Sequence, residues 1–456
     1  MRILFSNKTR VIGLLACVLV TSILILVCEI PLNNSRQNDL LKDKSETALA
    51  EPESDPAIII LPGIMGSELE ADEDHSTFYG GNIEKGDTVW MPDTVSDALE
   101  SVKDLDTSFI SDITLSDISD LIACFKFIST NEKGESINKI LPKAVTKNDK
   151  QIGTLGSYTE LYNTLYKKYS DSYDVIFFSY DWRMSSRDNA KLLDAFIKDK
   201  GFTDVTFVCH SMGGIVAAQY LTLSADSAAL TERVITIGTP YGGSPKALMV
   251  LQDGRYFNFG VLQNNIRDLA LNMPAIYELL PTEYAVLSEG YIENDGIILD
   301  NEETKNFIKD LARFEKDEES SGTNKLLYQN ALDSQSALIS EKGHIISDDR
   351  FDVYMIAGFN CVTVTKIVEE NNLFLKTDKT YFGDGTVSCE SAAFYNGELF
   401  DNPVYFVDGV DHRSLVKDSD TLELITSIID KDGQINKDDY NNKKIVDYED
   451  ITLRKD

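Results

Sequence analysis

Residues 205–218 (VTFVCHSMGGIVAA) constrain the fold more than any other stretch of this 456-residue chain. The stretch begins as a β-branched and aromatic run, which suits a buried strand. It ends as an apolar, alanine-rich segment, which predicts a helix. Ser211 lies between the two, where a sharp turn would project its side chain into open space, as a nucleophilic serine requires. Two glycines follow it, and Cys209 stands where the G-x-S-x-G pattern has its first glycine.

The net charge limits what the chain can bind. It carries 75 acidic and 43 basic side chains, a formal net charge of −32. This balance argues against nucleic acid as a partner, because the excess of acidic side chains opposes the neutralisation of phosphates. It also excludes electrostatic adhesion to an anionic membrane, so any contact with lipid would have to be apolar.

Neither the cysteines nor the C-terminal tail indicates a metal site or a cofactor. The six cysteines lack metal-ligand spacing. A Cys361–Cys389 disulfide is one interpretation, and free, buried thiols are the favoured one. Residues 430–439 have half the pattern of a calcium loop, but the first ligand position falls on Ile428, which cannot ligate. We therefore expect residues 431–456 to form a solvated, charged tail.

The N-terminus has the pattern of an export signal. Three basic residues precede an apolar run from Val11 to Cys28. This run of about 18 residues is near the lower limit for crossing a bilayer. Residues 1–30 are therefore predicted to be a retained signal anchor, with a cleaved signal peptide as the alternative. Both place the body outside the cytoplasm, anchored or secreted, and residues 31–56 are a predicted polar linker.

Residues 57–430 are predicted to form one α/β domain. Amphipathic helices are expected at 159–169, where Ser157 and Glu160 have capping-box spacing, and at 187–200, followed by Gly201. Strands alternating with helices predict a mostly parallel sheet covered on both faces. The acidic segment 71–150 is a predicted lid-like insertion, and 244–347, which lacks strand signals, is a predicted helical cap. The expected strands are 57–61, 174–180, 205–210, 233–240, 353–358 and 404–407.

The chain has four histidines, each of which is a candidate for the base that would activate Ser211. In an α/β-hydrolase arrangement an acid and then the histidine follow the serine in the chain, which excludes His75. His210 is adjacent to Ser211 and must point away from it. His344 lies in the cap segment, before any candidate acid loop. His412, after the last strand, is therefore the predicted base.

The acid should lie between Ser211 and His412. Asp384 is favoured because the glycines on both sides let the backbone turn tightly and aim the carboxylate. Asp408 and Asp411 are alternatives on the loop of the histidine itself.

A Pro-Gly turn after strand 57–61 can aim a backbone N–H across the top of the sheet. The N–H groups of Ile64 and Met212 are therefore predicted to form an oxyanion hole. The resulting acyl-serine would be released to water, giving hydrolysis, or to an alcohol, giving acyl transfer.

Further motifs recur in one order along the chain, in segments 61–63, 67–70, 180–183, 210–213, 238–246, 279–281, 383–387 and 411–412. Taken together, they resemble the lecithin:cholesterol acyltransferase family, which includes phospholipase A-type enzymes and phospholipid:diacylglycerol acyltransferases. The resemblance implies an α/β-hydrolase fold with a lid and a membrane-binding cap, and a Ser211–Asp384–His412 triad. It also implies that Asp181, Trp182 and Arg183 lie near the lipid, although a structural ion pair explains them equally well.

The expected activity is that of a serine-dependent lipid acyl hydrolase or O-acyltransferase on glycerolipid esters. An esterase for smaller soluble esters and a non-catalytic lipid-binding relative are the alternatives. No cysteine pair brackets the segment after Glu70, as it does in the animal enzymes. The shape of the lid and the choice of substrate are therefore left open.

Overall fold

The structure is a computed structural model that describes residues 56–76, 82–91, 115–255, 262–311, 323–340, 343–347, 350–370, 373–431, 435 and 444–452. These residues belong to one compact unit, Glu53–Asp456. The predicted signal anchor and linker lie outside the described residues, apart from residue 56. No helix in the described ranges has the length and apolar character needed to cross a bilayer.

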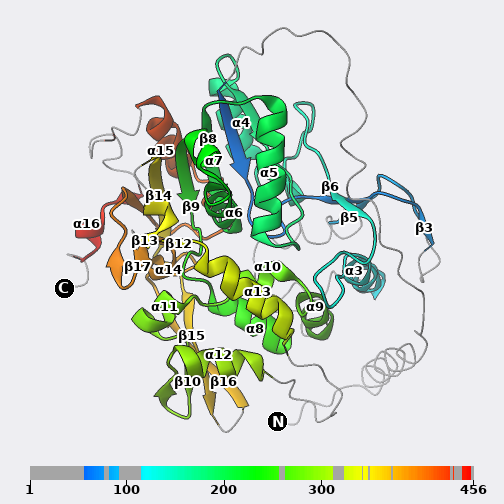
Figure 1. Ribbon diagram of the computed structural model, residues 1–456, viewed down its shortest axis with the longest axis vertical. Helices are drawn as coiled ribbons and strands as arrows, with labels where there is room; N and C mark the ends of the chain where they lie inside the picture. The colour runs from blue at the N-terminus through cyan, green and yellow to red at the C-terminus, as the bar shows by residue number, and fades with distance from the viewer. Residues whose placement is uncertain are drawn as a thin grey trace, which may run out of the picture. The chain divides into compact units, whose positions relative to one another are not determined.

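A seven-stranded sheet lies at the centre of this unit, in the order β20-β19-β14-β9-β8-β1-β7 (Figure 1). All neighbouring strands pair in parallel except β20, which is antiparallel to β19. The predicted mostly parallel α/β sheet is thus confirmed. Its strands are β1 (Ala57–Leu61), β7 (Asp174–Phe177), β8 (Val205–His210), β9 (Thr231–Ile237), β14 (Asp352–Phe359), β19 (Val404–Asp408) and β20 (Ile445–Val446).

The central strands are apolar on both faces because helices cover both faces. Alternate side chains along a strand point to opposite sides. Ile59 and Phe207 pack in a core with α5 (Ser186–Lys200) and α6 (Met212–Leu221), whereas Ile58 packs on the other face with α4 (Thr159–Tyr169) and α15 (Ser419–Asp430). The continuous apolar runs of the sequence follow from this double coverage.

The two predicted helices before β8 form within one residue of their expected bounds, but the predicted cap of α4 does not. In α5 the Ser185 side chain accepts from the backbone N–H of Asp188, and Gly201 ends the helix with a φ of 73°. The predicted capping box of α4 is wrong: Tyr158 is the N-cap residue and makes no side-chain cap. The Ser157 hydroxyl donates to the Thr154 carbonyl instead. The Tyr158 side chain is therefore available for contacts elsewhere.

The segment predicted to be a lid-like insertion contains both helix and strand. Helix α3 (Leu115–Phe127) precedes β6 (Ile140–Pro142), which pairs with β2 (Leu69–Ala71) in the three-stranded sheet β5-β2-β6. Strand β5 spans Thr88–Trp90, and β3 (His75–Ser76) pairs with β4 (Asn82–Ile83).

The predicted cap segment is mainly helical but also carries strands that sequence patterns did not indicate. Strands β10 (Ile292–Asn294) and β11 (Ile297–Ile298) join the hairpin β15 (Thr363–Glu370) and β16 (Leu373–Thr380) in a four-stranded sheet. Strands of two or three residues are too short to show a periodic pattern in the sequence. They form because they pair with neighbouring strands. The helices are α8 (Pro245–Asp253), α9 (Gln263–Ala270), α10 (Pro274–Glu278), α11 (Glu283–Glu289), α12 (Asn301–Lys309) and α13 (Lys325–Ser336), and β12 (Ile339–Ser340) pairs with β13 (Gly343–His344).

Part of the expected charged tail returns to the fold. Strand β20 extends the central sheet, and α16 (Tyr448–Thr452) packs Ile451 into a small core beside β19. The apolar pair Ile445–Val446 is too short to stand out in a charged stretch. The remaining elements are α7 (Ala225–Ala229), α14 (Cys389–Ala393), β17 (Phe394–Tyr395) and β18 (Glu398–Leu399).

The four cysteines within the described ranges are free thiols. Cys361 and Cys389 therefore form no disulfide, and the Cys389 thiol donates to the Gly358 carbonyl at 3.3 Å. The part of the chain that the structure describes holds no group of three or more His, Cys, Asp or Glu side chains suited to a metal ion.

Candidate active site

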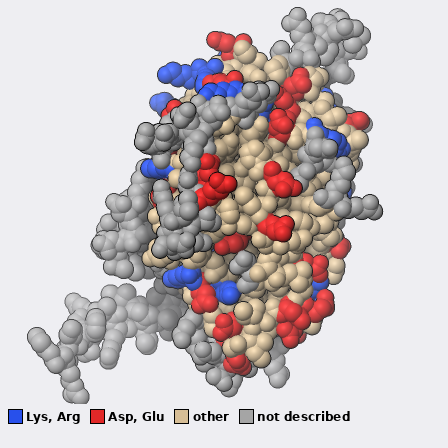
Figure 2. All heavy atoms as spheres, turned by 90° about the vertical axis from the view of Figure 1, so that its left-hand side faces the viewer, with Lys and Arg blue, Asp and Glu red and all other residues tan. Residues whose placement is uncertain are grey.

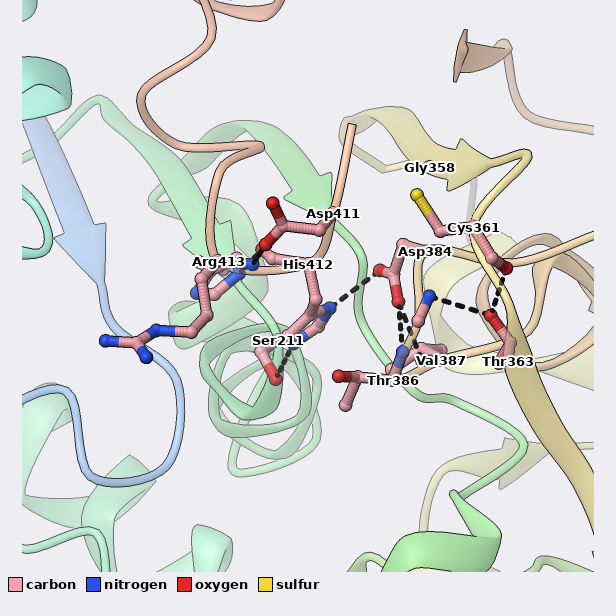
Figure 3. Close-up of polar contacts among 12 residues, drawn as sticks. Ser211, Gly358, Cys361, Thr363, Asp384, Thr386, Val387, Asp411, His412 and Arg413 are labelled. Atoms are coloured by element: carbon pink, nitrogen blue, oxygen red, sulfur yellow. Dashed lines mark hydrogen bonds and ion pairs between the residues drawn. The ribbon is translucent and has the colours of Figure 1, made fainter. Parts of the chain in front are cut away.

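Three side chains meet beside the carboxyl ends of parallel strands, where ligands bind in sheets of this kind (Figure 3). Ser211 directly follows β8, and His412 lies four residues beyond β19. Asp384 follows β16 and forms a β-bridge with Cys361, two residues beyond β14. The structure thus brings together the three residues predicted to form the triad.

These side chains form a continuous hydrogen-bond chain. His412 Nε2 lies 2.9 Å from Ser211 Oγ, and His412 Nδ1 lies 2.6 Å from Asp384 Oδ2. A carboxylate accepts only, so Nδ1 donates to it, which leaves Nε2 of a neutral ring to accept the serine proton. All three residues are buried, Asp384 most completely at 1% exposure. The arrangement is that of a nucleophile, a base and a group that orients the base.

The turn at Ser211 is strained as predicted, with φ 54° and ψ −126°. A Cβ on Gly213 would lie 2.2 Å from the Leu61 carbonyl oxygen, and one on Gly214 would lie 2.1 Å from Thr239 Oγ1. These glycines therefore let helix α6 approach β1 and the exit of β9. Cys209 is buried in β8, where its small side chain takes the place of the missing glycine.

The backbone fixes the Asp384 carboxylate. Its Oδ1 accepts from the N–H groups of Thr386 at 2.9 Å and Val387 at 2.7 Å, while Oδ2 faces His412. The two alternative acids are engaged elsewhere. Asp411 accepts from the Ser414 hydroxyl at 2.6 Å, and Asp408 accepts from the Asn360 amide at 2.9 Å.

The two predicted oxyanion donors belong to segments next to the nucleophile, one in the chain and one in space. Met212 is the first residue of α6, where a backbone N–H has no partner within the helix and the helix dipole favours negative charge. Ile64 follows Gly63, where an added Cβ would lie 2.8 Å from Ser211 Cβ. Both positions suit an oxyanion hole, and that role stays a prediction.

The structure adds two residues to this site that the sequence did not reveal. Tyr158 Oη lies 2.7 Å from the Gly63 N–H and 2.8 Å from His210 Nδ1. His210, expected only to point away from Ser211, places Nε2 2.9 Å from the His412 carbonyl oxygen. Tyr158 and His210 lie 52 positions apart, so no local pattern could have paired them.

The remaining histidine candidate, His344, is not part of the triad. It is buried at 3% exposure among the rings of Tyr241, Tyr284, Tyr395 and Phe400. Its Nδ1 accepts from the Ile346 N–H at 3.3 Å. Burial lowers the pKa of His344 to about 3.

The three predicted lipid-site residues make structural contacts. Arg183 donates to both carboxylate oxygens of Asp181, at 2.9 and 2.6 Å, and to the Ile128 carbonyl at 2.6 Å. Trp182 is 1% exposed and donates to the Ser67 carbonyl at 3.1 Å. These contacts match the structural ion pair that was the alternative explanation, and a role at the lipid stays a prediction.

Both the sequence and the structure are similar to those of known proteins. Residues 150–392 match the family described as lecithin:cholesterol acyltransferase. A solved chain from the Tle4–Tli4 complex has a TM-score of 0.51 at 14% identity, covering 84% of this chain and 99% of that one. This likeness supports the α/β-hydrolase fold and nothing more specific.

Two curated relatives come from Arabidopsis thaliana. Lecithin-cholesterol acyltransferase-like 4 is 30% identical over 121 residues, which is 24% of this chain and 23% of the relative. Phospholipase A(1) LCAT3 is 27% identical over 117 residues, 23% of this chain and 26% of the relative. The aligned part is thus about a quarter of either relative. Since the family match extends over more than half of the sequence and includes Ser211 and Asp384, the chain belongs to the lecithin:cholesterol acyltransferase family.

Proposed function

We propose that this protein is a serine acyl hydrolase or O-acyltransferase that acts on ester bonds of glycerolipids. The observation that carries the proposal is the hydrogen-bond chain from Asp384 through His412 to the strained Ser211. Membership of the family supports acyl chemistry. The names of the two relatives, an acyltransferase-like protein and a phospholipase A(1), support a lipid ester as the substrate.

The proposed reaction begins with transfer of the serine proton. His412 Nε2 takes the proton of Ser211 Oγ as the oxygen attacks the acyl carbonyl. Asp384 holds the ring in the required tautomer and stabilises the imidazolium that forms. Because two backbone N–H groups fix the carboxylate, little reorganisation is needed as the charge develops.

The negative oxygen of the tetrahedral intermediate would be received by the N–H groups of Ile64 and Met212. Loss of one such donor typically costs ~10²- to 10³-fold in rate. The imidazolium then returns its proton to the leaving alcohol, which produces the acyl-serine. Water or a second alcohol attacks this ester with His412 again as the base, so one site serves both hydrolysis and transfer.

The surface charge favours apolar contact with the lipid over electrostatic attraction. The face drawn in Figure 2 carries acidic side chains along its whole length. With a formal net charge of −32, the protein would be repelled by anionic headgroups. We therefore expect activity to be higher on neutral or zwitterionic vesicles than on anionic ones. The location outside the cytoplasm remains part of the proposal and rests on residues 1–30.

The serine mechanism is tested by covalent labelling. A fluorophosphonate should label the wild-type protein at Ser211, and Ser211→Ala should abolish the label. Ser336→Ala is the matched control, because Ser336 lies at the end of α13 and bonds only locally to the Asp333 carbonyl. Undiminished labelling of Ser211→Ala would remove the proposed nucleophile.

The substrate class is tested with mixed phospholipid vesicles, with and without an added long-chain alcohol, by mass spectrometry of the products. Free fatty acid indicates hydrolysis, and a new ester of the alcohol indicates transfer. Faster turnover of short, monomeric esters than of vesicles would instead indicate an esterase for soluble substrates. Lipid retention without any turnover would indicate the non-catalytic alternative.

A further inference from the structure

We propose that Tyr158 and His210 are positioning residues that hold the His412 backbone and the Gly63–Ile64 turn close to Ser211. The inference rests on the proposed function, because it assigns these residues a role in that reaction. Neither side chain is part of the hydrogen-bond chain from Asp384 through His412 to Ser211. Their effect would be exerted through the groups that they hold.

The bonds in this network run in one direction. The Gly63 N–H can only donate, so Tyr158 Oη accepts there and donates its own proton to His210 Nδ1. The His412 carbonyl can only accept, so His210 Nε2 carries the ring proton. The direction of each of these three bonds is therefore assigned, and aligned bonds of this kind strengthen one another.

The network requires a neutral His210, and its surroundings keep it neutral. Burial lowers the pKa of His210 to about 3, and the neighbouring His412 acts in the same direction. Arg413 also lowers this pKa, whereas Asp384 and the hydrogen bond to the His412 backbone act against the shift. The ring centroids of His210 and His412 are 4.8 Å apart, so a charged His210 would oppose formation of the catalytic imidazolium.

The network ties together two loops that the fold brings from distant parts of the chain. Gly63 lies between β1 and the predicted oxyanion donor Ile64, and His412 lies beyond β19. A small displacement of either loop would lengthen the bond from His412 Nε2 to Ser211 Oγ or move the Ile64 N–H away from the oxyanion. Misplacement of about 1 Å can cost ~10²-fold in rate.

The first test compares tyrosine-to-phenylalanine variants at the two ends of helix α4, where Tyr158 is the N-cap residue and Tyr169 is the last residue. Tyr158→Phe removes a buried hydroxyl with two bonds in the network. Tyr169→Phe also removes a hydroxyl with two bonds, to the Thr426 carbonyl at 2.9 Å and to Asp430 at 2.8 Å, away from the site. We expect Tyr158→Phe to lower kcat ~10- to 10²-fold with KM within ~2-fold, and Tyr169→Phe to leave both within ~2-fold. Equal kcat values for the two variants would overturn the positioning role.

The second test uses His210, with rescue by a residue of similar reach. His210→Gln can still donate from its amide to the His412 carbonyl, whereas His210→Phe fills the space and donates nothing. We expect kcat of His210→Gln within ~5-fold of wild type and a loss of ~10²-fold for His210→Phe, at similar thermal midpoints. The same kcat for both variants would contradict the inference.

A spectroscopic measurement separates this inference from the proposed function. The chain holds only four histidines, so ¹⁵N-histidine spectra can be assigned by single substitutions. We expect His210 as the neutral Nε2–H tautomer, and a low-field His412 Nδ1–H signal that shifts in Tyr158→Phe but not in Tyr169→Phe. A wild-type protein without turnover or Ser211 labelling would remove the proposed function and the positioning role with it. If the wild type is active but Tyr158→Phe has the same His412 Nδ1–H signal and the same kcat, the positioning role alone would be removed.

Discussion

Lys246, on helix α8, donates a hydrogen bond of 2.7 Å from Nζ to the backbone carbonyl of Gly385, the residue after Asp384. The same ammonium group donates to Thr386 Oγ1 at 3.0 Å. Burial lowers the pKa of Lys246, and the charge of Asp384 acts against this shift. The lysine thus anchors the loop whose N–H groups hold the Asp384 carboxylate.

Replacing this lysine should therefore affect catalysis more than folding. Lys246→Met keeps the buried apolar stem but loses both hydrogen bonds to the Asp384 loop. We expect kcat on a chromogenic ester to fall ~10-fold, because a less ordered acid orients His412 less well. Lys191→Met is the control, since Lys191 pairs only with the exposed Asp188. Equal kcat values for the two variants would show that the anchor has no catalytic effect.

Gly63 offers a test of the close approach between the oxyanion turn and the nucleophile. An added Cβ would lie 2.8 Å from Ser211 Cβ and 3.3 Å from His210 Nδ1. Hydrogen bonds hold both of these side chains in place. Gly63→Ala should lower the rate of fluorophosphonate labelling ~10²-fold by displacing Ser211 or the turn. Gly86→Ala adds a methyl group that meets nothing within 4 Å, although its φ of 93° carries strain. It should lose some stability and keep the labelling rate, and a normal rate for Gly63→Ala would contradict the described geometry.

The sequence was sufficient for the six parallel strands of the central sheet, although not for β20, and for the three residues that meet at the candidate site, because these features leave local signals. Buried strands are apolar on both faces, and Ser211, Asp384 and His412 each occupy a turn of recognisable type beside a strand end. The order of these turns along the chain then excluded His75 and His344 without any structural information.

Contacts between distant segments could not be predicted in the same way. The spacing of Ser157 and Glu160 is typical of a capping box, and nothing in it indicates that Tyr158, which lies between them, contacts Gly63 and His210. Strand β10 has three residues and is stabilised by pairing with β15, which lies more than 70 positions further along the chain. Neither feature changes the local composition of the sequence.

The buried pair of Asp181 and Arg183 is predicted to contribute to stability. Arg183 is fully buried, and its removal leaves the carboxylate without its cation in a site of low exposure. Arg183→Met should lower the free energy of unfolding by about 3–5 kcal/mol. Lys198→Met, which breaks an exposed pair with Asp194, should cost less than about 1 kcal/mol. Urea unfolding measures both.

Kinetics of the folded protein then distinguish a structural role of residues 181–183 from a role in lipid binding. If the pair is structural, Arg183→Met should keep the KM of wild type for a phospholipid substrate under conditions where it is folded. A variant of normal stability with a raised KM would instead place Arg183 at the lipid.

The buried His344 should make the protein sensitive to acid. Its pKa of about 3 lies below the ordinary value of 6.5, because burial disfavours the charged ring. Below pH 6.5 the unfolded chain takes up a proton at this position that the folded chain does not. Stability is therefore unaffected by this group at neutral pH and falls as the pH drops from about 6.5 toward 3, by up to ~1.4 kcal/mol per pH unit.

His344→Phe preserves an aromatic ring in the cluster and removes the group that titrates. Between pH 6 and pH 5, the loss of unfolding free energy should be smaller in this variant than in wild type by about 1 kcal/mol, measured by urea unfolding at both pH values. Tyr395→Phe is the control, because it alters the same cluster without removing an imidazole. It should retain the wild-type dependence on pH. An unchanged slope in His344→Phe would mean that His344 becomes protonated in the folded protein, and that its burial among the rings is not maintained in solution.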